Sequence, residues 1–369
     1  MDLEQYLQVV PYAALAVVIT CINLCSLAII LWSKALMSHP QVILVINLIL
    51  THLLQGLVVM PVYALRKSRE YPVSAFPIVC DTWRFSYMLT FYGTCLNVLL
   101  IALDRWLATR FFQKYASHHY RHKHFVGAVM VSWFYVISLC LLPFIVHDNN
   151  DGSENKSSSP FYCNYKQPHY WSSFMLICNT VLPYLSVIAI YLYIRKRIKK
   201  SAANTSYAVG NLLRNSTISV FYNNNNISHS NDNHSVKDRS VSPSKIVNRI
   251  SRTKNKSVKR KSAQYRKVTK LTFRIIFIYG VTWTPSIVYY SIVTLNPDAF
   301  PQSYYVSKWE MVATYTIKLI TFFNAAAAPV IYCYNHLEFR REAKKMFRLF
   351  RRSRKCEVDN SGTIFVLNR

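Results

Sequence analysis

The chain has 369 residues, 52% of them hydrophobic, and carries 44 Lys and Arg against 16 Asp and Glu. A soluble domain of this length interleaves its charges with its apolar residues, whereas here the two are segregated into long apolar runs and basic intervals. This segregation indicates a membrane protein. It also excludes a nucleic-acid binder as the explanation for the net charge of +28, because the basic residues border the apolar runs.

Seven apolar segments are each about long enough to cross a bilayer as a helix. They lie at approximately 10–32, 41–64, 79–104, 125–146, 172–194, 271–295 and 309–333. The predicted fold class is therefore an all-α membrane protein, a seven-transmembrane helix bundle. We expect an N-terminal segment 1–9, a transmembrane domain 10–335 interrupted by a polar, disordered loop at about 200–262, and a tail 336–369.

Basic residues gather between 195 and 270 and again between 336 and 369. Because such residues favour the cytoplasmic side, we expect a cytoplasmic fifth-to-sixth connection, a cytoplasmic tail and an extracellular N-terminus. Arg66, Lys67 and Arg69 fall on the predicted outer side and count against this orientation. The first nine residues lack a cleavable signal pattern, so the first helix is expected to act as its own insertion signal.

The first two segments each carry a polar side chain at membrane depth, Asn23 and His52. An amide inside the bilayer needs a partner, so Asn23 is expected to face another helix, with a lipid-facing position as the alternative. A histidine at this depth is a candidate functional residue. A neutral His52 that only hydrogen-bonds a neighbour is an equal alternative.

The third segment organises the chain. From Cys80 to Arg105 a continuous helix would span roughly 38 Å, at about 1.5 Å per residue, slightly more than the roughly 30 Å bilayer core. It would place Cys80 at one membrane face and Asp104-Arg105 at the other. With this topology Cys80 and Cys163 are the natural disulfide pair, because they face the oxidising side. The remaining cysteines are interpreted as buried apolar fillers, apart from Cys356.

Modification sites and a terminal helix are predicted outside the spans. Asn155 begins an Asn-Lys-Ser triplet on the expected outer side and is a candidate glycosylation site. After the seventh segment, apolar residues alternate with many basic ones, which predicts a short amphipathic helix on the inner leaflet. Cys356, just beyond it, is a candidate for acylation. In the sixth segment, Pro285 is expected to bend the helix and form a hinge.

An ordered set of motifs runs through these segments and resembles the rhodopsin-like family of G-protein-coupled receptors over nearly the whole chain, apart from the long loop and the end of the tail. Each motif alone is weak, but their order is specific. They are Cys80, Asp104-Arg105-Trp106, Trp133, Pro183, Tyr191, Thr282-Trp283-Thr284-Pro285 and Ala328-Pro329-Val330-Ile331-Tyr332.

The resemblance implies a signalling role for several of these residues. Arg105, paired with Asp104 at rest, would swing free to contact Tyr191 and the G protein. Trp283, above the Pro285 bend, would sense ligand, and Tyr332 would rearrange inward on activation. Connector positions that the family usually fills with Pro, Ile and Phe hold Pro183, Cys95 and Tyr279.

Two departures from the family pattern fall in one polar cluster. His52 stands where the family nearly always has the aspartate that binds sodium, and Ala328 replaces the asparagine of the seventh-helix motif. We therefore expect that sodium is not bound there. Asn23, His52, Thr94 and Asn324 could still hold a water network.

The ligand pocket that the resemblance implies differs from that of two known classes. Amine receptors of the family have an aspartate where this chain has Tyr87, and opsins have their retinal lysine where this chain has Phe322. Lys318 and Arg84 give the pocket a positive tendency, which suits an anionic ligand, with lipid and peptide ligands also open. Alternatively, Arg84 pairs with Asp81, and Lys318 with Glu310 or a loop acid. The expected lining is Trp83, Arg84, Tyr87, Met88, Phe91, Met175, Asn179, Ser286, Tyr290, Lys318 and Phe322.

The function that follows is a plasma-membrane receptor that couples an extracellular ligand to a heterotrimeric G protein, with arrestin and membrane lipids as further candidate partners and no nucleic acid. One alternative is an ion or proton transporter that uses His52 and Lys318 as relays. Another is a seven-helix protein that binds ligand without signalling. No enzymatic constellation, cofactor motif or metal-spaced cluster is present in the sequence.

Overall fold

The computed structural model describes residues 3–68, 77–111, 122–148, 169–200, 273–295, 308–335 and 337–358. Within these ranges, seven helices are long and apolar enough to span a membrane: Val9–Trp32, Val42–Leu65, Asp81–Arg110, His122–Pro143, Tyr170–Lys200, Phe273–Leu295 and Val312–Ile331. The predicted seven-helix fold class is confirmed. The chain divides into two compact units, one of Met1–Ile190 with Leu271–Arg369 and the other of Tyr191–Lys270.

The first two spans are joined by a very short connection. Helix α1 (Leu3–Trp32) ends before Ser33, whose hydroxyl accepts a hydrogen bond from the Leu36 backbone N–H at 3.3 Å and so caps the single turn α2 (Lys34–Met37). The second span then begins with α3 (Val42–Leu54) and continues through the π-helical turn η1 (Gln55–Val59) into α4 (Met60–Ser68). Both α3 and α4 pack against α1.

In the described part of the chain, each π-helical turn ends shortly before a proline. Turn η1 ends two residues before Pro61, and η3 (Ile177–Val181) ends two residues before Pro183. A proline cannot donate to the carbonyl four residues earlier, and its ring clashes with that carbonyl. The wider turn moves the carbonyl away from the ring and keeps the helix continuous, as π-turns inside α-helices commonly do.

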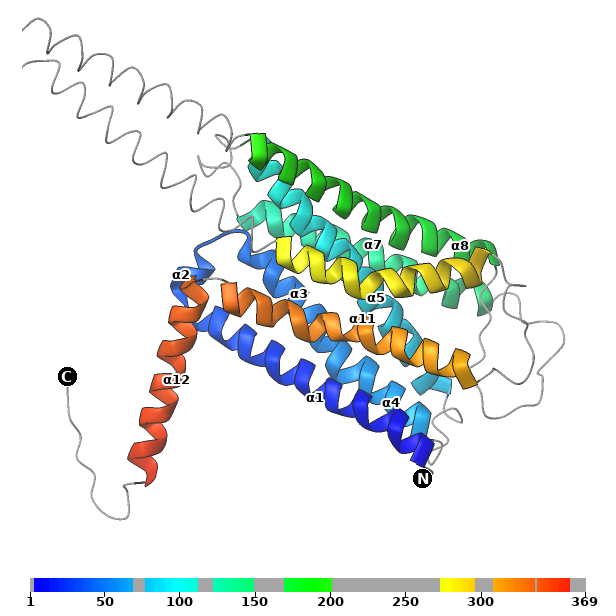
Figure 1. The fold of residues 1–369 in the computed structure, drawn as a ribbon, viewed down its shortest axis with the longest axis horizontal. Helices are drawn as coiled ribbons and strands as arrows, with labels where there is room; N and C mark the ends of the chain where they lie inside the picture. Colours follow the sequence, from blue (N-terminus) through cyan, green and yellow to red (C-terminus); the bar gives the residue numbers. More distant parts are fainter. Residues whose placement is uncertain are drawn as a thin grey trace, which may run out of the picture. The chain divides into compact units, whose positions relative to one another are not determined.

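Helix α5 (Pro77–Arg110) is the third span, and it packs against α3, η1, η3 and α7 (His122–Asp148). Figure 1 shows α5 running among the other helices of the bundle. A hydrogen bond from Trp133 Nε1 to Asn47 Oδ1, 2.7 Å long, joins α7 to α3. The fifth span begins with α8 (His169–Leu176) and η3, and its helix continues over 182–190 in the first unit.

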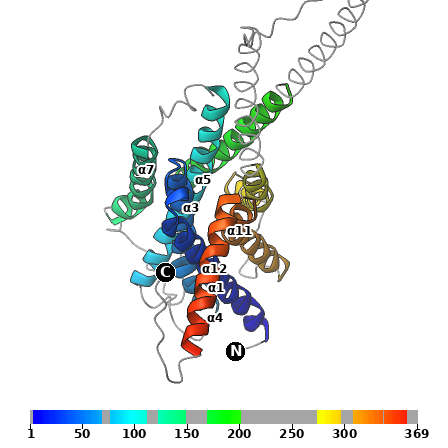
Figure 2. The ribbon, with the colours of Figure 1, turned by 90° about the vertical axis from the view of Figure 1, so that its left-hand side faces the viewer.

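The last three helices complete the first unit. The 273–295 helix precedes α11 (Lys308–Asn335), which packs along α1, and α12 (Leu337–Val358) then leaves α11 at a steep angle (Figures 1 and 2). Phe339 anchors α12, because its side chain is only 1% exposed and lies in an apolar cluster with Ile29, Leu36 and Val42. The predicted helix after the seventh span is thus present and is 22 residues long.

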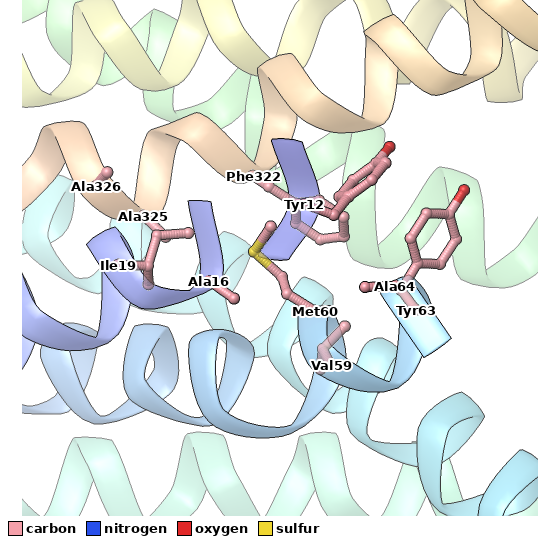
Figure 3. Close-up of a cluster of buried hydrophobic side chains, with 10 residues drawn as sticks. All are labelled: Tyr12, Ala16, Ile19, Val59, Met60, Tyr63, Ala64, Phe322, Ala325 and Ala326. Carbon is pink, nitrogen blue, oxygen red and sulfur yellow. The ribbon is translucent and has the colours of Figure 1, made fainter. Parts of the chain in front are cut away.

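One apolar cluster joins α1, the second span and α11, as Figure 3 shows. Its buried members are Tyr12, Ala16, Ile19, Val59, Met60, Tyr63, Ala64, Phe322, Ala325 and Ala326. The alanines of α11 allow its backbone to approach α1 closely, which suits helix pairing in a bilayer, where small residues favour close packing. The Tyr12 hydroxyl donates to the Tyr315 carbonyl oxygen at 3.0 Å and so completes the junction.

The interpretation of the cysteines inside the spans as buried fillers is correct for Cys95 and Cys140 and wrong for three others. Cys21, Cys25 and Cys178 are exposed on the outer surface of their helices. Thiols behave as small apolar groups, so a lipid-facing position suits them as well as a core position does. Cys80, Cys163, Cys333 and Cys356 have side chains outside the described part, so the predicted disulfide and acylation remain predictions.

Substitution of Gly56 by alanine tests the close contact between η1 and α1. A Cβ added at Gly56 would lie 2.7 Å from Thr20 Oγ1 and 3.0 Å from Ile19 Cγ2, both on stiff β-branched side chains. We expect Gly56→Ala to lower the free energy of unfolding by about 1–3 kcal/mol through overpacking. Gly127→Ala is the control, because a Cβ there meets nothing within 4 Å, and it should leave stability unchanged or slightly raised. Thermal unfolding of both purified variants in detergent measures the difference, and equal melting temperatures would contradict the contact.

Candidate functional site

A small chamber lies among the second, third, sixth and seventh spans. Its wall mixes aromatic rings with hydroxyl groups and one ammonium group. The lining residues are Gln55, Tyr87, Thr90, Phe91, Thr94, Trp283, Ser286, Lys318, Thr321 and Phe322. The indole Nε1 of Trp283 is buried and has no hydrogen-bond partner among the described residues.

A second, larger and more open cavity lies on the other side of Tyr87 and Phe91. It is bounded by α5, α8, η3 and the 273–295 helix, and its wall is apolar with several hydroxyl groups. The lining residues are Tyr87, Met88, Phe91, Tyr92, Ser172, Met175, Leu176, Thr180, Ile287, Tyr290 and Thr294. Tyr87 and Phe91 therefore separate the two cavities and face both.

Aromatic rings form a continuous column beside these cavities. Ring centroids are 6.0 Å apart for Tyr63 and Trp83, 5.5 Å for Trp83 and Tyr87, and 6.0 Å for Tyr87 and Phe91. Phe91 then lies 4.5 Å from the Trp283 ring. A ligand that displaces a ring in one of these cavities would thus press on Trp283, because close-packed rings transmit displacement.

The two cations of the expected pocket have different surroundings. The Arg84 Nη2 lies 3.5 Å from Asp81 Oδ1 one helical turn away, as one of the alternatives from the sequence had it. The Lys318 ammonium lies over the Tyr63 ring, 5.1 Å from its centroid, in a cation–π arrangement, and it lines the smaller chamber. Glu310, the other acid considered, has its side chain outside the described part.

Most of the expected pocket residues are brought together. Tyr87, Met88, Phe91, Met175, Ser286, Tyr290, Lys318 and Phe322 all line one or both cavities. Trp83 instead belongs to the ring column and donates its Nε1–H to the Val59 carbonyl oxygen at 3.2 Å. Asn179 lines neither cavity, because its Oδ1 accepts from the Tyr135 hydroxyl at 2.7 Å and its Nδ2 donates to Met175 Sδ at 3.5 Å.

Below the chamber, polar contacts connect the 273–295 helix to its neighbours. The Tyr279 hydroxyl donates to Cys95 Sγ of α5 at 3.3 Å, which makes a polar connector where the family usually has two apolar side chains. The hydroxyls of Ser286 and of Thr321 on α11 share a hydrogen bond, which joins the two helices. The Tyr184 hydroxyl is 2.6 Å from Thr284 Oγ1 and ties this helix to residues 182–190.

The predicted polar cluster at mid-membrane depth is buried. Asn23 Nδ2 donates to the carbonyl oxygens of Ile19 at 2.8 Å and Ala325 at 3.0 Å, so the expected contact with another helix is present. Thr94 donates to the Thr90 carbonyl oxygen, and Asn324 is buried on α11. His52 is 1% exposed, and neither of its ring nitrogens has a hydrogen-bond partner within the described ranges.

The Asp104–Arg105 pair lies at the end of the bundle that also holds α2. Both side chains are buried, and Arg105 Nε donates to Asp104 Oδ2 at 2.8 Å. Arg105 Nη2 donates to the same oxygen. It also donates to Gln41 Oε1 at 2.7 Å. The Trp106 ring packs edge-on against Phe111 at the end of the same helix.

Three prolines of the predicted motifs lie within the spans. Pro183 follows η3, Pro285 lies inside the 273–295 helix, and Pro329 lies inside α11. Tyr191 is helical in the second unit. The side chain of Tyr332 and the glycosylation candidate Asn155 fall outside the described part.

Three functional candidates were missed by the sequence reasoning. Gln41 contacts Arg105 from 64 positions away, Tyr63 contacts both Trp83 and Lys318, and the Asn97 amide is buried without a partner among the described residues. The periodicity of α5 could have identified Asn97, because it lies one turn after Thr94. No local signal distinguishes Gln41 from a solvated residue at a helix start.

A seven-span membrane protein with a cavity among its helices and a buried Asp-Arg pair at one end has the architecture of a receptor. The sequence matches the 7 transmembrane receptor (rhodopsin family) over residues 22–332. The chain belongs to this family of G-protein-coupled receptors, so the resemblance seen in the motifs is confirmed. It is similar to 5-hydroxytryptamine receptor 1B of Mus musculus, with 24% identity over 322 residues, and of Homo sapiens, with 25% over 327 residues. Each alignment covers 84% of this chain and 78% of the relative.

Opposite effects on stability are expected for leucine at two positions of the polar cluster. His52→Leu removes a buried polar group that has no described partner and should raise the free energy of unfolding by about 1–3 kcal/mol. Asn23→Leu removes the donor to the Ala325 carbonyl and should lower it by about as much. Thermal unfolding in detergent measures both. A His52→Leu variant that melts below the parent would show that His52 has a stabilising partner.

Proposed function

We propose that this receptor lies in the plasma membrane with its N-terminus outside and transmits the binding of an aromatic, carboxylate-bearing ligand to a heterotrimeric G protein. The observation that carries the ligand class is Lys318, a cation in the wall of an aromatic chamber. The Trp283 indole N–H in the same wall offers a second donor. A carboxylate held by an ammonium and an N–H donor in a low-dielectric site makes charge-assisted hydrogen bonds, which are stronger than neutral ones.

An amine ligand fits this chamber poorly, although the relatives are receptors for 5-hydroxytryptamine. Amine receptors of the family counter the ligand's charge with an aspartate where this chain has Tyr87. None of the described residues that line the two cavities is Asp or Glu. A buried cation without a counter-charge is strongly disfavoured, and the Lys318 ammonium would repel it further.

Signalling is proposed to proceed by release of Arg105 from its partners at the α2 end of the bundle. The guanidinium is buried and paired with Asp104, which supports a resting state. The ring column offers a physical route by which ligand binding reaches Trp283 and the 273–295 helix. Movement of that helix would expose Arg105 to a G protein, as a shift between two populated states.

The polar cluster is proposed to work without sodium. His52 replaces the family's acid, and the Asn23 amide already donates to Ala325, so the cluster supplies no carboxylate to balance a cation. A neutral cluster in a bilayer favours water over a bare monovalent ion.

Substitution of Lys318 tests the ligand class. With a panel of ligand pairs that share one ring and differ in charge, such as 5-hydroxytryptamine and 5-hydroxyindole-3-acetate, we expect activation by carboxylates. Lys318→Met should lower carboxylate potency by roughly tenfold or more, because hydrogen bonds to charged groups contribute about 1.5–3 kcal/mol. Arg84→Met is the matched control with a smaller effect, since Arg84 lines neither of the two cavities. Activation by the amines alone would refute the proposal.

Substitutions at the Asp-Arg pair test the switch. Arg105→Ala should abolish G-protein activation, because it removes the proposed contact. Asp104→Asn should raise ligand-independent activation several-fold, because it weakens a charge-assisted pair that exists only in the resting state. Nucleotide exchange in membranes, divided by the amount of surface receptor, measures both. Full signalling by Arg105→Ala would contradict the switch.

A further inference from the structure

We propose that Gln41 is a second restraint on Arg105, so that the resting receptor is held from the connection between the first two spans as well as from Asp104. Arg105 Nη2 donates to Gln41 Oε1 at 2.7 Å, across 64 positions of sequence. Asp104 accepts from the Nε and Nη2 of the same guanidinium. The two acceptors therefore come from different spans and hold the guanidinium from two directions.

The Gln41 side chain is available for this contact because of where it stands. It occupies the N-cap position of α3, where a side chain commonly accepts from the first backbone N–H groups of the helix, yet it makes no such capping bond. Its backbone carbonyl accepts from Leu44 N–H at 3.2 Å, which fixes the start of the helix. The side-chain amide is thereby directed to α5 while the backbone begins α3.

The segment that carries Gln41 is fixed on three sides. His39 Nε2 lies 3.3 Å from Glu338 of α12, and the Val42 N–H donates to the His39 carbonyl oxygen at 3.0 Å. The His122 ring of α7 lies 3.1 Å from the Met37 carbonyl oxygen. Because these contacts hold the segment in place, the Gln41 amide oxygen has a defined position. Little side-chain entropy is then lost when Arg105 re-forms its hydrogen bond to this oxygen.

The energetic effect depends on the state of Arg105. Arg105 is 6% exposed, so its hydrogen bonds lie in a region where an unmade bond is costly. In the resting state Gln41 supplies a neutral acceptor to a charged donor. If Arg105 moves toward a G protein, that bond is lost, so Gln41 favours the resting state selectively.

This inference rests on the proposed role of Arg105, and it makes predictions of opposite sign at one position. Gln41→Leu removes the acceptor and should raise ligand-independent nucleotide exchange by roughly tenfold or more, as expected for the loss of one hydrogen bond to a charged group. Gln41→Glu replaces the amide with a carboxylate of the same length and should lower the exchange rate, because a charge-assisted pair is stronger. Damage to the fold would shift both variants in the same direction.

The experiment uses the full-length receptor in membranes, in the wild-type background and in the Asp104→Asn background, where a raised basal rate makes a decrease measurable. Ser38→Ala is the matched control, because Ser38 lies on the same connection and its hydroxyl bonds only locally, to the Ala35 carbonyl oxygen at 2.7 Å. It should leave the basal rate per surface receptor unchanged.

The outcomes separate this inference from the proposed switch. If Arg105→Ala signals fully, the switch itself is wrong. If Arg105→Ala is silent but Gln41→Leu and Gln41→Glu both leave the basal rate unchanged, or both raise it, only the restraint by Gln41 is overturned. A rise with leucine and a fall with glutamate, both absent when Arg105 is alanine, support the restraint.

Discussion

The absence of water from the hydrocarbon core of a bilayer constrains this structure more than any single contact, because every buried polar group must find its partner inside the protein. The helices use few such groups, and several of them cross between spans. Asn23 bonds the backbone of α11, and Trp133 bonds Asn47 across α7 and α3. Contacts of this kind fix which faces of the helices meet, since the apolar residues around them would pack almost equally well against lipid.

The same constraint connects the cavities to the α2 end of the bundle. The ring column ends at Trp283, whose ring lies 5.0 Å from that of Tyr279. Tyr279 in turn bonds Cys95 of α5, the helix that carries Arg105. Trp283 is therefore one ring contact away from a hydrogen bond that joins the 273–295 helix to α5 in the membrane interior.

Sequence reasoning predicted what depends on composition and periodicity. Seven apolar runs gave seven spans, the helix after the seventh span is present, and most of the residues expected to line a pocket do so. The residues that it misplaced or missed are those whose side-chain orientation is set by contacts between helices. Helical spacing placed Asn179 near the pocket, but its amide is taken up by Tyr135 of a neighbouring helix. The π-turn of η1 shifts every later side chain of its span, so Tyr63 was not expected under Lys318.

The small number of buried acidic side chains bears on how the proposed resting state is maintained. Among the described residues, Asp104 is the one buried acid, and the position of the family's mid-membrane acid holds His52. Under the proposal that the polar cluster works without sodium, no cation at mid-membrane depth adds to the resting state, because the described part of the cluster offers it no carboxylate. In the proposed mechanism, the restraints at Arg105 supply that stability instead. A single exposed ion pair would contribute little, but a buried guanidinium held by both Asp104 and Gln41 loses two acceptors at once when it moves. In the proposed switch, the loss of two buried bonds in one step would make the transition cooperative without an ion.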